Sequence, residues 1–280
     1  MEDLTPAGHE LLRLTRSESG VLSLQLQAGE NLVNRPMVDA LHAALQVVEQ
    51  RAHPKALIVS SSGKFFMNGL DLAWMSEHPD DAISVVADFW KLLARILTLD
   101  CHTVTHTLAG ATQGRVAAIN GHAFGAGIFL ALSCDWRLMR NKRGFLCFPE
   151  LNLGMRLSKV RYSCRTCAFD CVAHVLCVTW KGFGELAKAK LSAKTLREAI
   201  LTGKRYASTD AVAAGIVDRE CAVDDLKAEA ENLALSLLPK SLKLMRFDAT
   251  ALQTMKIELY TDAYRALSSG LTNAEPASRL

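Results

Sequence analysis

The sequence lacks the features that mark several large classes of protein. No apolar run is long enough to cross a membrane, because Asp135 and Arg137 interrupt the longest candidate. The first residues, MEDLTPAGHELLRL, contain early acids and no apolar core, so we expect no secretory signal there. The formal net charge of the 280 residues is only +3, with Lys and Arg spread along the chain. This balance argues against nucleic acid as a partner.

Cysteine, in contrast, is abundant and unevenly placed. The chain has 8 cysteines, and the segment YSCRTCAFDCVAHVLCVTW holds Cys164, Cys167, Cys171 and Cys177. Without a secretory signal we do not expect a disulfide framework. A zinc site that also uses His174 is an alternative, but the spacing matches no familiar zinc template. We therefore predict no metal site.

The apolar pattern predicts strands that alternate with helices, followed by a mostly helical region beyond residue 184. The predicted strands are 20–26, 56–61, 115–119, 135–139, 143–148 and a brief 215–218. The predicted helices are 35–50, 80–99, 126–133, 193–203, 223–237 and 240–268, and a Ser-Thr-Asp cap signal opens another at 208. This order favours an α/β layer fold with crossover connections and a helical tail.

The stretch AAINGHAFGAG puts Gly121, Gly125 and Gly127 between a predicted strand and a predicted helix. Its spacing fits neither the dinucleotide fingerprint nor the P-loop. The glycines could serve only a tightly packed turn. Alternatively, the free amides of the helix N-terminus could form part of an oxyanion hole, which needs a second backbone donor. The segment SSSGKFFMNGLDLAWM, residues 60–75, offers that donor at a turn that contains Gly69.

Two of these stretches together resemble the enoyl-CoA hydratase/isomerase, or crotonase, superfamily. GKFFMNGLDL is similar to its F-x-x-G-x-D-L turn and AAINGHAFGAG to its N-G-x-A-x-G-x-G turn, while RNKRGFLCFPELNLGM extends the match. The similarity is strongest to plant-type peroxisomal Δ3,Δ2-enoyl-CoA isomerases. The resemblance implies a fold of repeated ββα units with a helical C-terminal region. We expect a crotonase-like core over 1–200, a helical region over 201–280, and a homo-oligomer, either a trimer or a hexamer.

The resemblance also implies a site for an acyl-CoA thioester. Its carbonyl oxygen would lie between the backbone amides of Leu70 and Ala126. The implied substrate-binding positions are Met67, Asn68, Gly69, Gly125, Gly127 and Phe129. CoA is then part of the substrate, and no separate cofactor is expected.

The acids available at the site distinguish the reactions of the superfamily. Hydratases use two glutamates; here one position holds Phe129 and the other Glu150. A single carboxylate beside an oxyanion hole suits a proton shuttle that converts 3-enoyl-CoA into 2-trans-enoyl-CoA. The alternatives are hydration or another crotonase reaction, or a non-catalytic acyl-CoA-binding scaffold. Asp71 is a second candidate acid, although capping a helix is its more common role at such a position. We expect His122 to be structural.

Other segments carry predictions that are separate from the site. Ser278, Arg279 and Leu280 resemble the S-K-L address, so we expect a peroxisomal protein that binds the import receptor through these residues. The segments 100–115 and 156–184 depart from the family pattern. Our hypothesis is that one or both are retained or mispredicted coding sequence.

Overall fold

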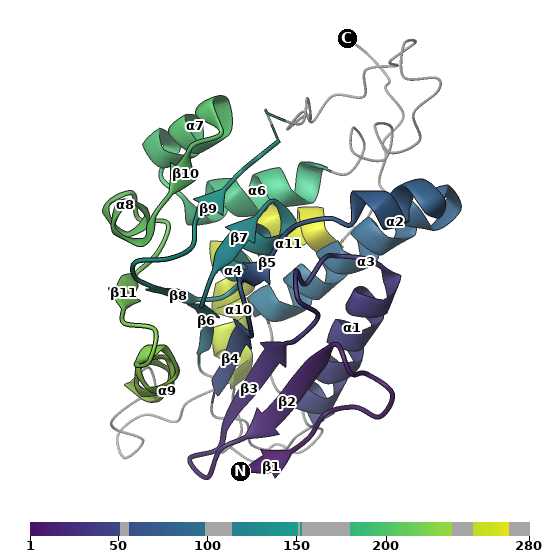
Figure 1. Ribbon diagram of the computed structural model, residues 1–280, viewed down its shortest axis with the longest axis vertical. Coiled ribbons are helices and arrows are strands. Elements are labelled where there is room, and N and C mark those ends of the chain that lie inside the picture. Colours follow the sequence, from purple (N-terminus) through teal and green to yellow (C-terminus); the bar gives the residue numbers. More distant parts are fainter. Residues whose placement is uncertain (51–55, 99–113, 151, 153–179, 237–248, 269–280) are drawn as a thin grey trace.

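The computed structural model describes residues 1–50, 56–98, 114–150, 152, 180–236 and 249–268. Within these residues, a large sheet forms the centre of the molecule (Figure 1). Its strands are β1 (Glu2–Asp3), β2 (Leu12–Arg16), β3 (Val21–Leu26), β4 (Ala56–Ser61), β6 (Arg115–Ile119), β8 (Trp136–Arg140) and β11 (Arg219–Cys221), in this spatial order. The β1–β3 pairs are antiparallel, whereas β3, β4, β6, β8 and β11 run parallel.

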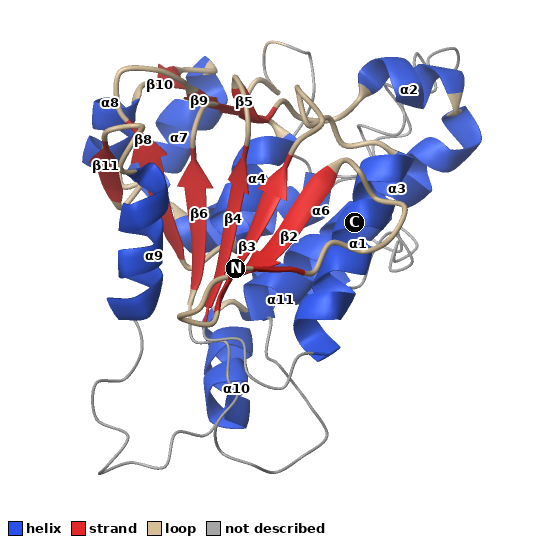
Figure 2. Ribbon diagram, turned by 60° about the horizontal axis from the view of Figure 1, so that its bottom comes forward, coloured by secondary structure: helices blue, strands red, loops and turns tan. Residues whose placement is uncertain are grey.

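A second, smaller sheet lies at the end of the large one where the parallel strands terminate (Figure 2). It contains β5 (Phe65–Met67), β7 (His122–Phe124), β9 (Leu146–Cys147) and β10 (Arg205–Tyr206), in the order β10-β9-β7-β5. The chain passes from β4 to β5, from β6 to β7 and from β8 to β9. Each pair therefore consists of one strand of the large sheet followed by one strand of the small sheet, and a helix follows the first two pairs.

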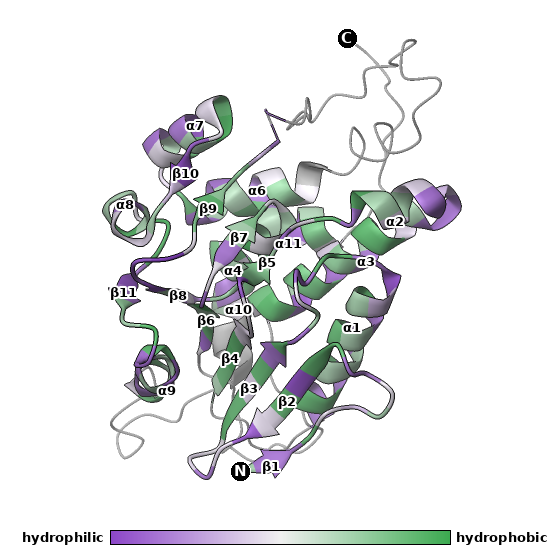
Figure 3. Cartoon of the chain, in the orientation of Figure 1, coloured by the Kyte–Doolittle hydropathy of each residue, from purple (hydrophilic) through white to green (hydrophobic). Residues whose placement is uncertain are grey.

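Helices cover both faces of the large sheet. They are α1 (Arg35–Gln50), α2 (Leu72–Glu77), α3 (Pro79–Thr98), α4 (Ala126–Ser133), α6 (Trp180–Lys190), α7 (Ala193–Thr202), α8 (Ser208–Ala213), α9 (Leu226–Ser236), α10 (Ala249–Leu259) and α11 (Thr261–Ser268). Apolar residues of α9 pack on one face of the sheet, and α1, α3 and α4 pack on the other. Figure 3 shows the result: β3 and α3 are mostly hydrophobic, while α9 carries many hydrophilic residues.

The predicted elements with the strongest apolar pattern are confirmed. The helices at 35–50 and 126–133 and the strands at 56–61 and 115–119 have the predicted bounds. Gly203 ends α7 with a left-handed φ of 60°, as its position after the helix suggested. Prediction and structure agree for these segments because an apolar stripe at helical spacing identifies a buried helix directly, and a short apolar run between turns identifies a buried strand.

Three local predictions are wrong in detail. Helix α8 has Ala207 at its N-cap without a side-chain hydrogen bond, so Ser208 begins the helix and does not cap it. No strand forms over the predicted residues 215–218; β11 begins directly after them, at Arg219. Of the helix predicted over 240–268, residues 240–248 lie outside the described residues, and the rest is divided between α10 and α11, where Thr261 Oγ1 donates to the carbonyl oxygens of Ile257 and Glu258. Such bonds compete with the regular helical pattern.

The remaining predictions about the chain concern domains and membranes. The division at residue 200 stays a prediction; residues beyond it are mostly helical but also supply β10 and β11. In the part of the chain that the structure describes, no helix combines the length and the apolar character needed to cross a bilayer. Most of the segments 100–115 and 156–184 lies outside the described residues.

Candidate active site

The parallel pairing of the small sheet brings three separate turns together. Met67 of β5 is opposite Ala123 of β7, and Phe124 is opposite Cys147 of β9. The residues that leave these three strands must therefore emerge side by side. A β-carbon on Gly125 would lie 3.9 Å from Gly69 Cα and 3.8 Å from Pro149 Cγ. The sequence motifs around 69, 125 and 149 thus meet at one place.

The first turn presents a free backbone donor at Leu70. Gly69 O accepts a hydrogen bond from Val33 N at 2.9 Å, and Asp71 N donates to Val33 O at 3.0 Å. Because successive amides of an extended chain point to opposite sides, the Leu70 N–H points away from Val33. Among the described residues, no hydrogen bond uses this N–H.

The second turn presents the N-terminus of α4. Gly125 is its N-cap, with a φ of 50° that favours glycine, and no side chain caps the helix. The Ala126 N–H has no partner in the described part of the chain. A β-carbon on Gly69 would lie 3.9 Å from Ala126 N, so the two turns lie very close together. Every residue of α4 is buried, which places its free amides and positive dipole end in a poorly solvated environment.

Gly127 allows α4 to lie this close to the first turn. A β-carbon at this position would be only 2.2 Å from Met67 O and 2.9 Å from Met67 Cβ. No side chain can occupy that space, since backbone atoms form the obstacle. The Gly127 position is therefore explained by close approach of α4 to β5.

Glu150 follows directly after the third turn and is a buried acid. It is 2% exposed, and neither carboxylate oxygen has a hydrogen-bond partner among the described residues. Burial raises the pKa of Glu150 from 4.5 to about 7. Glu150 is therefore not a solvent-exposed surface acid. A carboxyl group with this pKa can exchange a proton near neutral pH.

Comparison with known proteins agrees with this arrangement. Residues 16–161 match the enoyl-CoA hydratase/isomerase family. The chain is also 30% identical over 268 residues to enoyl-CoA delta isomerase 3 of Arabidopsis thaliana, covering 92% of this chain and 97% of that protein. The chain belongs to the enoyl-CoA hydratase/isomerase family.

Further relatives agree with the family and its fold. The peroxisomal enoyl-CoA delta isomerase 1 of Arabidopsis thaliana is 35% identical over 129 residues, 45% of this chain and 48% of that protein. A solved structure of an enoyl-CoA isomerase from Mycobacterium tuberculosis superposes with a TM-score of 0.72 at 20% identity, covering 94% of this chain and 96% of that chain. At this identity the likeness shows the crotonase fold alone. As a family member, the chain is similar to enoyl-CoA isomerases and hydratases.

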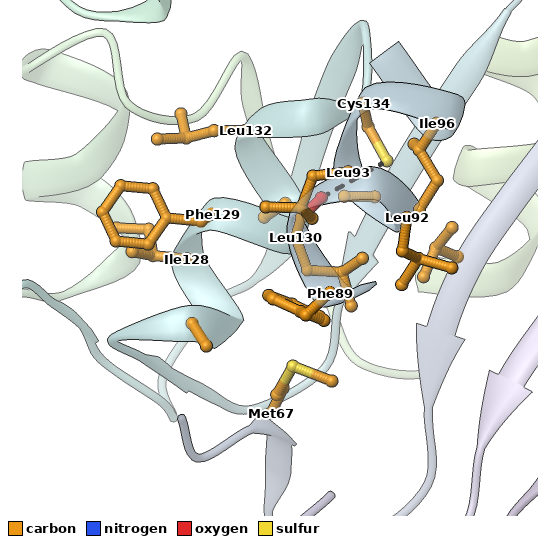
Figure 4. Packing of buried hydrophobic residues seen from close by; sticks show 14 of the residues in the cluster. Met67, Phe89, Leu92, Leu93, Ile96, Ile128, Phe129, Leu130, Leu132 and Cys134 are labelled. Atoms are coloured by element: carbon orange, nitrogen blue, oxygen red, sulfur yellow. Dashed lines mark hydrogen bonds between the residues drawn. The ribbon is translucent and has the colours of Figure 1, made fainter. Parts of the chain in front are cut away.

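At the position where hydratases of the family have a second glutamate, this chain has an aromatic cluster. Phe129 is fully buried, with its ring stacked on Phe183 at 4.4 Å and edge-on to Phe148 at 5.5 Å between centroids. Trp90 of α3 extends the cluster, 5.7 Å from Phe183. Figure 4 shows that Phe129 points away from the side of α4 where Leu130 meets Leu93. The cluster is apolar and adjoins the strand end that carries Glu150.

Met67 and Asn68 lie in different environments. Met67 is fully buried and points toward Phe89 in the core (Figure 4). Asn68 is partly exposed, and it is fixed because its Nδ2 donates to Glu30 Oε2 at 2.8 Å and its backbone N donates to Glu30 O at 2.9 Å. That these two residues bind the substrate stays a prediction.

Asp71 caps α2. Its Oδ1 accepts a hydrogen bond from Trp74 N at 3.0 Å, and its Oδ2 accepts one from Asn34 Nδ2 at 2.9 Å. Both carboxylate oxygens are therefore engaged in holding the turn that contains Leu70. This geometry favours the capping role over acid–base chemistry.

His122 is the first residue of β7 and is half-buried. Its ring lies among those of Phe65, Phe124 and Phe145, with centroids 5.2–5.7 Å apart. Burial and the positive charges of Lys64, Arg143 and Arg205 lower the pKa of His122. These contacts agree with the structural role that we expected.

Two side chains of the aromatic cluster were not identified from the sequence. Phe183 falls within the segment 156–184 that departs from the family pattern, yet it is a buried residue of α6. Trp90 lies in the helix predicted over 80–99, and the sequence pattern assigns it no other role. A pattern search could not have found either residue, since only the packing of α3 and α6 brings them to Phe129.

The residues of the alternative zinc site in the cysteine segment lie outside the described residues. They are Cys164, Cys167, Cys171, Cys177 and His174. Within the described ranges, no group of three or more His, Cys, Asp or Glu side chains is arranged to hold a metal ion.

Proposed function

We propose that this family member is a Δ3,Δ2-enoyl-CoA isomerase that converts 3-enoyl-CoA into 2-trans-enoyl-CoA. The observation that carries the proposal is that the turn leading into the buried Glu150 meets two other turns at Pro149 and Gly125. Among the described residues, the Leu70 and Ala126 N–H groups of those turns and the Glu150 carboxylate have no hydrogen-bond partner. Two amide donors at one place suit an oxygen that gains negative charge. A carboxyl group with a pKa of about 7 suits a base that must release its proton again.

In the proposed reaction, the thioester oxygen accepts hydrogen bonds from the Leu70 and Ala126 amides. The Glu150 carboxylate removes a proton from C2, and the electron pair of that C–H bond forms a C1–C2 double bond while the carbonyl electron pair moves onto the thioester oxygen. The resulting dienolate still has its C3–C4 double bond, which becomes the C2–C3 double bond only when C4 is protonated. The protonated Glu150 then returns the proton at C4, which leaves the double bond between C2 and C3. No atom is gained or lost, so the reaction requires no cofactor beyond the CoA of the substrate.

Phe129 supports isomerisation over hydration. Hydration adds water across the double bond, and the family's hydratases use two glutamates for it. The aromatic rings of Phe129, Phe148 and Phe183 occupy the region of the second acid and offer neither a proton nor a hydrogen bond to water. An apolar wall also favours the neutral form of Glu150, in agreement with its raised pKa.

The names of relatives support the same substrate class and a location. Relatives from Arabidopsis thaliana are named enoyl-CoA delta isomerases, and two of them are named peroxisomal. We propose that this chain acts in peroxisomal fatty-acid oxidation, with Ser278, Arg279 and Leu280 bound by the import receptor. These three residues lie outside the described part of the chain. The proposed homo-oligomer can be tested by light scattering of the purified protein.

The experiment that tests the reaction follows the ultraviolet absorbance of the conjugated 2-enoyl thioester. Purified protein is mixed with 3-cis-hexenoyl-CoA, and Glu150→Gln is measured in parallel. Glu77→Gln is the matched control, because Glu77 is an exposed glutamate on α2. We expect absorbance to grow with the wild type and the control and to remain flat with Glu150→Gln.

Three results would contradict the proposal. Equal rates in the wild type and Glu150→Gln would exclude Glu150 as the base. Loss of absorbance when 2-trans-hexenoyl-CoA is supplied, with no isomerisation of the 3-enoyl substrate, would instead identify a hydratase. A wild type inactive with both substrates, yet able to bind acyl-CoA, would favour the scaffold.

A further inference from the structure

A half-buried lysine lies at the opposite end of α4 from Ala126. Lys190, the last residue of α6, donates a hydrogen bond from Nζ to Cys134 O at 3.3 Å. Cys134 is the C-cap of α4, and Arg137 Nη1 donates to the same oxygen at 3.2 Å. Lys190 Nζ also lies 4.0 Å from the ring centroid of Tyr260. Two cations thus bind the C-terminal end of the helix whose N-terminus carries the proposed oxyanion donor.

The carboxylates near Lys190 pair with other cations. Asp135 is bound by Lys256 Nζ at 2.8 Å and by Arg115 Nη1 at 3.5 Å. Arg137 has its own partner, since its Nη2 lies 3.4 Å from a carboxylate oxygen of Asp218.

Lys190 itself has no carboxylate within 4 Å in the described part of the chain. Burial lowers the pKa of Lys190 to about 8; Asp135 opposes this change, while Arg137 and Lys256 add to it. A partly desolvated cation with no carboxylate within 4 Å costs free energy, and the negative charge of Asp135 offsets only part of that cost. Packing alone is therefore a poor explanation for its charge.

The geometry of α4 connects this charge to the proposed site. The helix advances 1.5 Å per residue, so Ala126 and Cys134 lie about 12 Å apart along its axis. All of α4 is buried, so little water screens a charge at one end from the other. A cation at the C-terminus offsets the negative end of the helix dipole and leaves the N-terminal amides more attractive to an anion.

We propose that Lys190 is a positioning residue that acts through α4: its positive charge strengthens the pull of the Ala126 N–H on the thioester oxygen. The inference rests on the proposed oxyanion hole. One unit charge at this separation and a typical protein dielectric changes the stability of an oxyanion by a factor of about ten. The charge of Lys190 would stabilise the negatively charged dienolate more than the neutral bound substrate, so kcat should change more than KM.

The test uses a probe that reports on the oxyanion hole without needing Glu150. In 4-(dimethylamino)cinnamoyl-CoA, the amino group pushes electrons toward the thioester carbonyl, so a stronger pull on that oxygen moves the absorption band to longer wavelength. Lys190→Met removes the charge and keeps the length of the side chain. Lys190→Arg keeps the charge and is the matched control.

We expect a clear band shift with the wild type and Lys190→Arg and a smaller shift with Lys190→Met at saturating probe. Isomerisation should show the same pattern, with kcat lowered about tenfold in Lys190→Met and KM nearly unchanged. Shifts of equal size in all three proteins would overturn the inference. Equal losses in Lys190→Met and Lys190→Arg would also overturn it, because packing would then be the cause.

A measurement on the unmodified protein covers the case in which Lys190→Met does not fold. The groups that act on the lysine are Asp135, Cys134, Arg137 and Lys256, with Tyr260 against its side chain. The wild-type band shift should decrease as pH rises through about 8 while the probe stays bound. A shift that is constant over this range overturns the inference. If the bound probe shows no shift at any pH, both the role of Lys190 and the oxyanion hole of the proposed function are refuted.

Discussion

Replacing Glu150 with glutamine should stabilise the folded chain at alkaline pH while it removes the proposed base. In the folded protein burial raises the pKa of Glu150 from 4.5 to about 7. At pH values between these two pKa values, Glu150 is therefore protonated in the folded state and ionised in the unfolded state. The contribution of Glu150 to stability is greatest below pH 4.5 and is lost as pH rises through about 7.

The magnitude follows from the two pKa values. Their difference corresponds to about 3 kcal/mol between the fully protonated and fully ionised limits, because each pKa unit is worth about 1.4 kcal/mol. Most of this falls between about pH 5 and about pH 8. Glutamine does not ionise, so Glu150→Gln lacks this pH-dependent loss. The comparison across pH also cancels the constant difference between a buried amide and a buried acid.

The assay is urea denaturation of the wild type and Glu150→Gln at both pH values, followed by circular dichroism. We expect the variant to gain stability relative to the wild type on going from the lower to the higher pH. Glu77→Gln, a change at an exposed glutamate on α2, is the control for the loss of one acid. Activity should disappear in Glu150→Gln. A variant that is more stable at high pH but inactive would show that the buried base lowers the stability of the wild type.

The reasoning would be refuted by a stability difference between wild type and Glu150→Gln that does not change with pH. That result would mean that the Glu150 carboxylate finds hydrogen bonds or solvent in the folded state, so that its pKa stays near 4.5. In that case the activity of the wild type should also lack a rise centred near pH 7.

Three further predictions concern single positions. Asp71→Ala removes the cap of α2 and should cost about 1 kcal/mol in urea denaturation, with kcat lowered less than about threefold; a complete loss of kcat would return Asp71 to the catalytic candidates. Gly127→Ala puts a β-carbon 2.2 Å from Met67 O, so it should lower both the melting temperature and the activity. Gly184→Ala is the control, because its β-carbon would have no atom within 4 Å, and it should lower neither. Equal behaviour of the two variants would contradict the close approach of α4 to β5. Deletion of 278–280 from a fluorescent fusion should move the protein from peroxisomes to the cytosol, and unchanged peroxisomal fluorescence would exclude the import prediction.

Much of the fold could be predicted because its main elements carry local patterns. The apolar stripe of 35–50 and the apolar run of 56–61 have the periods of a helix and of a buried strand. Strands β5, β7 and β9 have only two or three residues, which is too few to establish a period. They exist because β5 and β9 both pair with β7, and that pairing joins residues from 23 positions apart (Phe124 and Cys147) to 57 positions apart (Phe65 and His122) in the sequence.

The sequence by itself determined the chemical groups of the candidate site: two glycine turns with backbone amides, and Glu150 as the acid. Only the tertiary structure decided what surrounds them. The pairing of β5, β7 and β9 brings Pro149 to Gly125, and the packing of α6 brings Phe183 to Phe129 and Lys190 to the end of α4. The proton affinity of Glu150 also depends on this packing, because burial is a property of the assembled core and is not encoded at any one position.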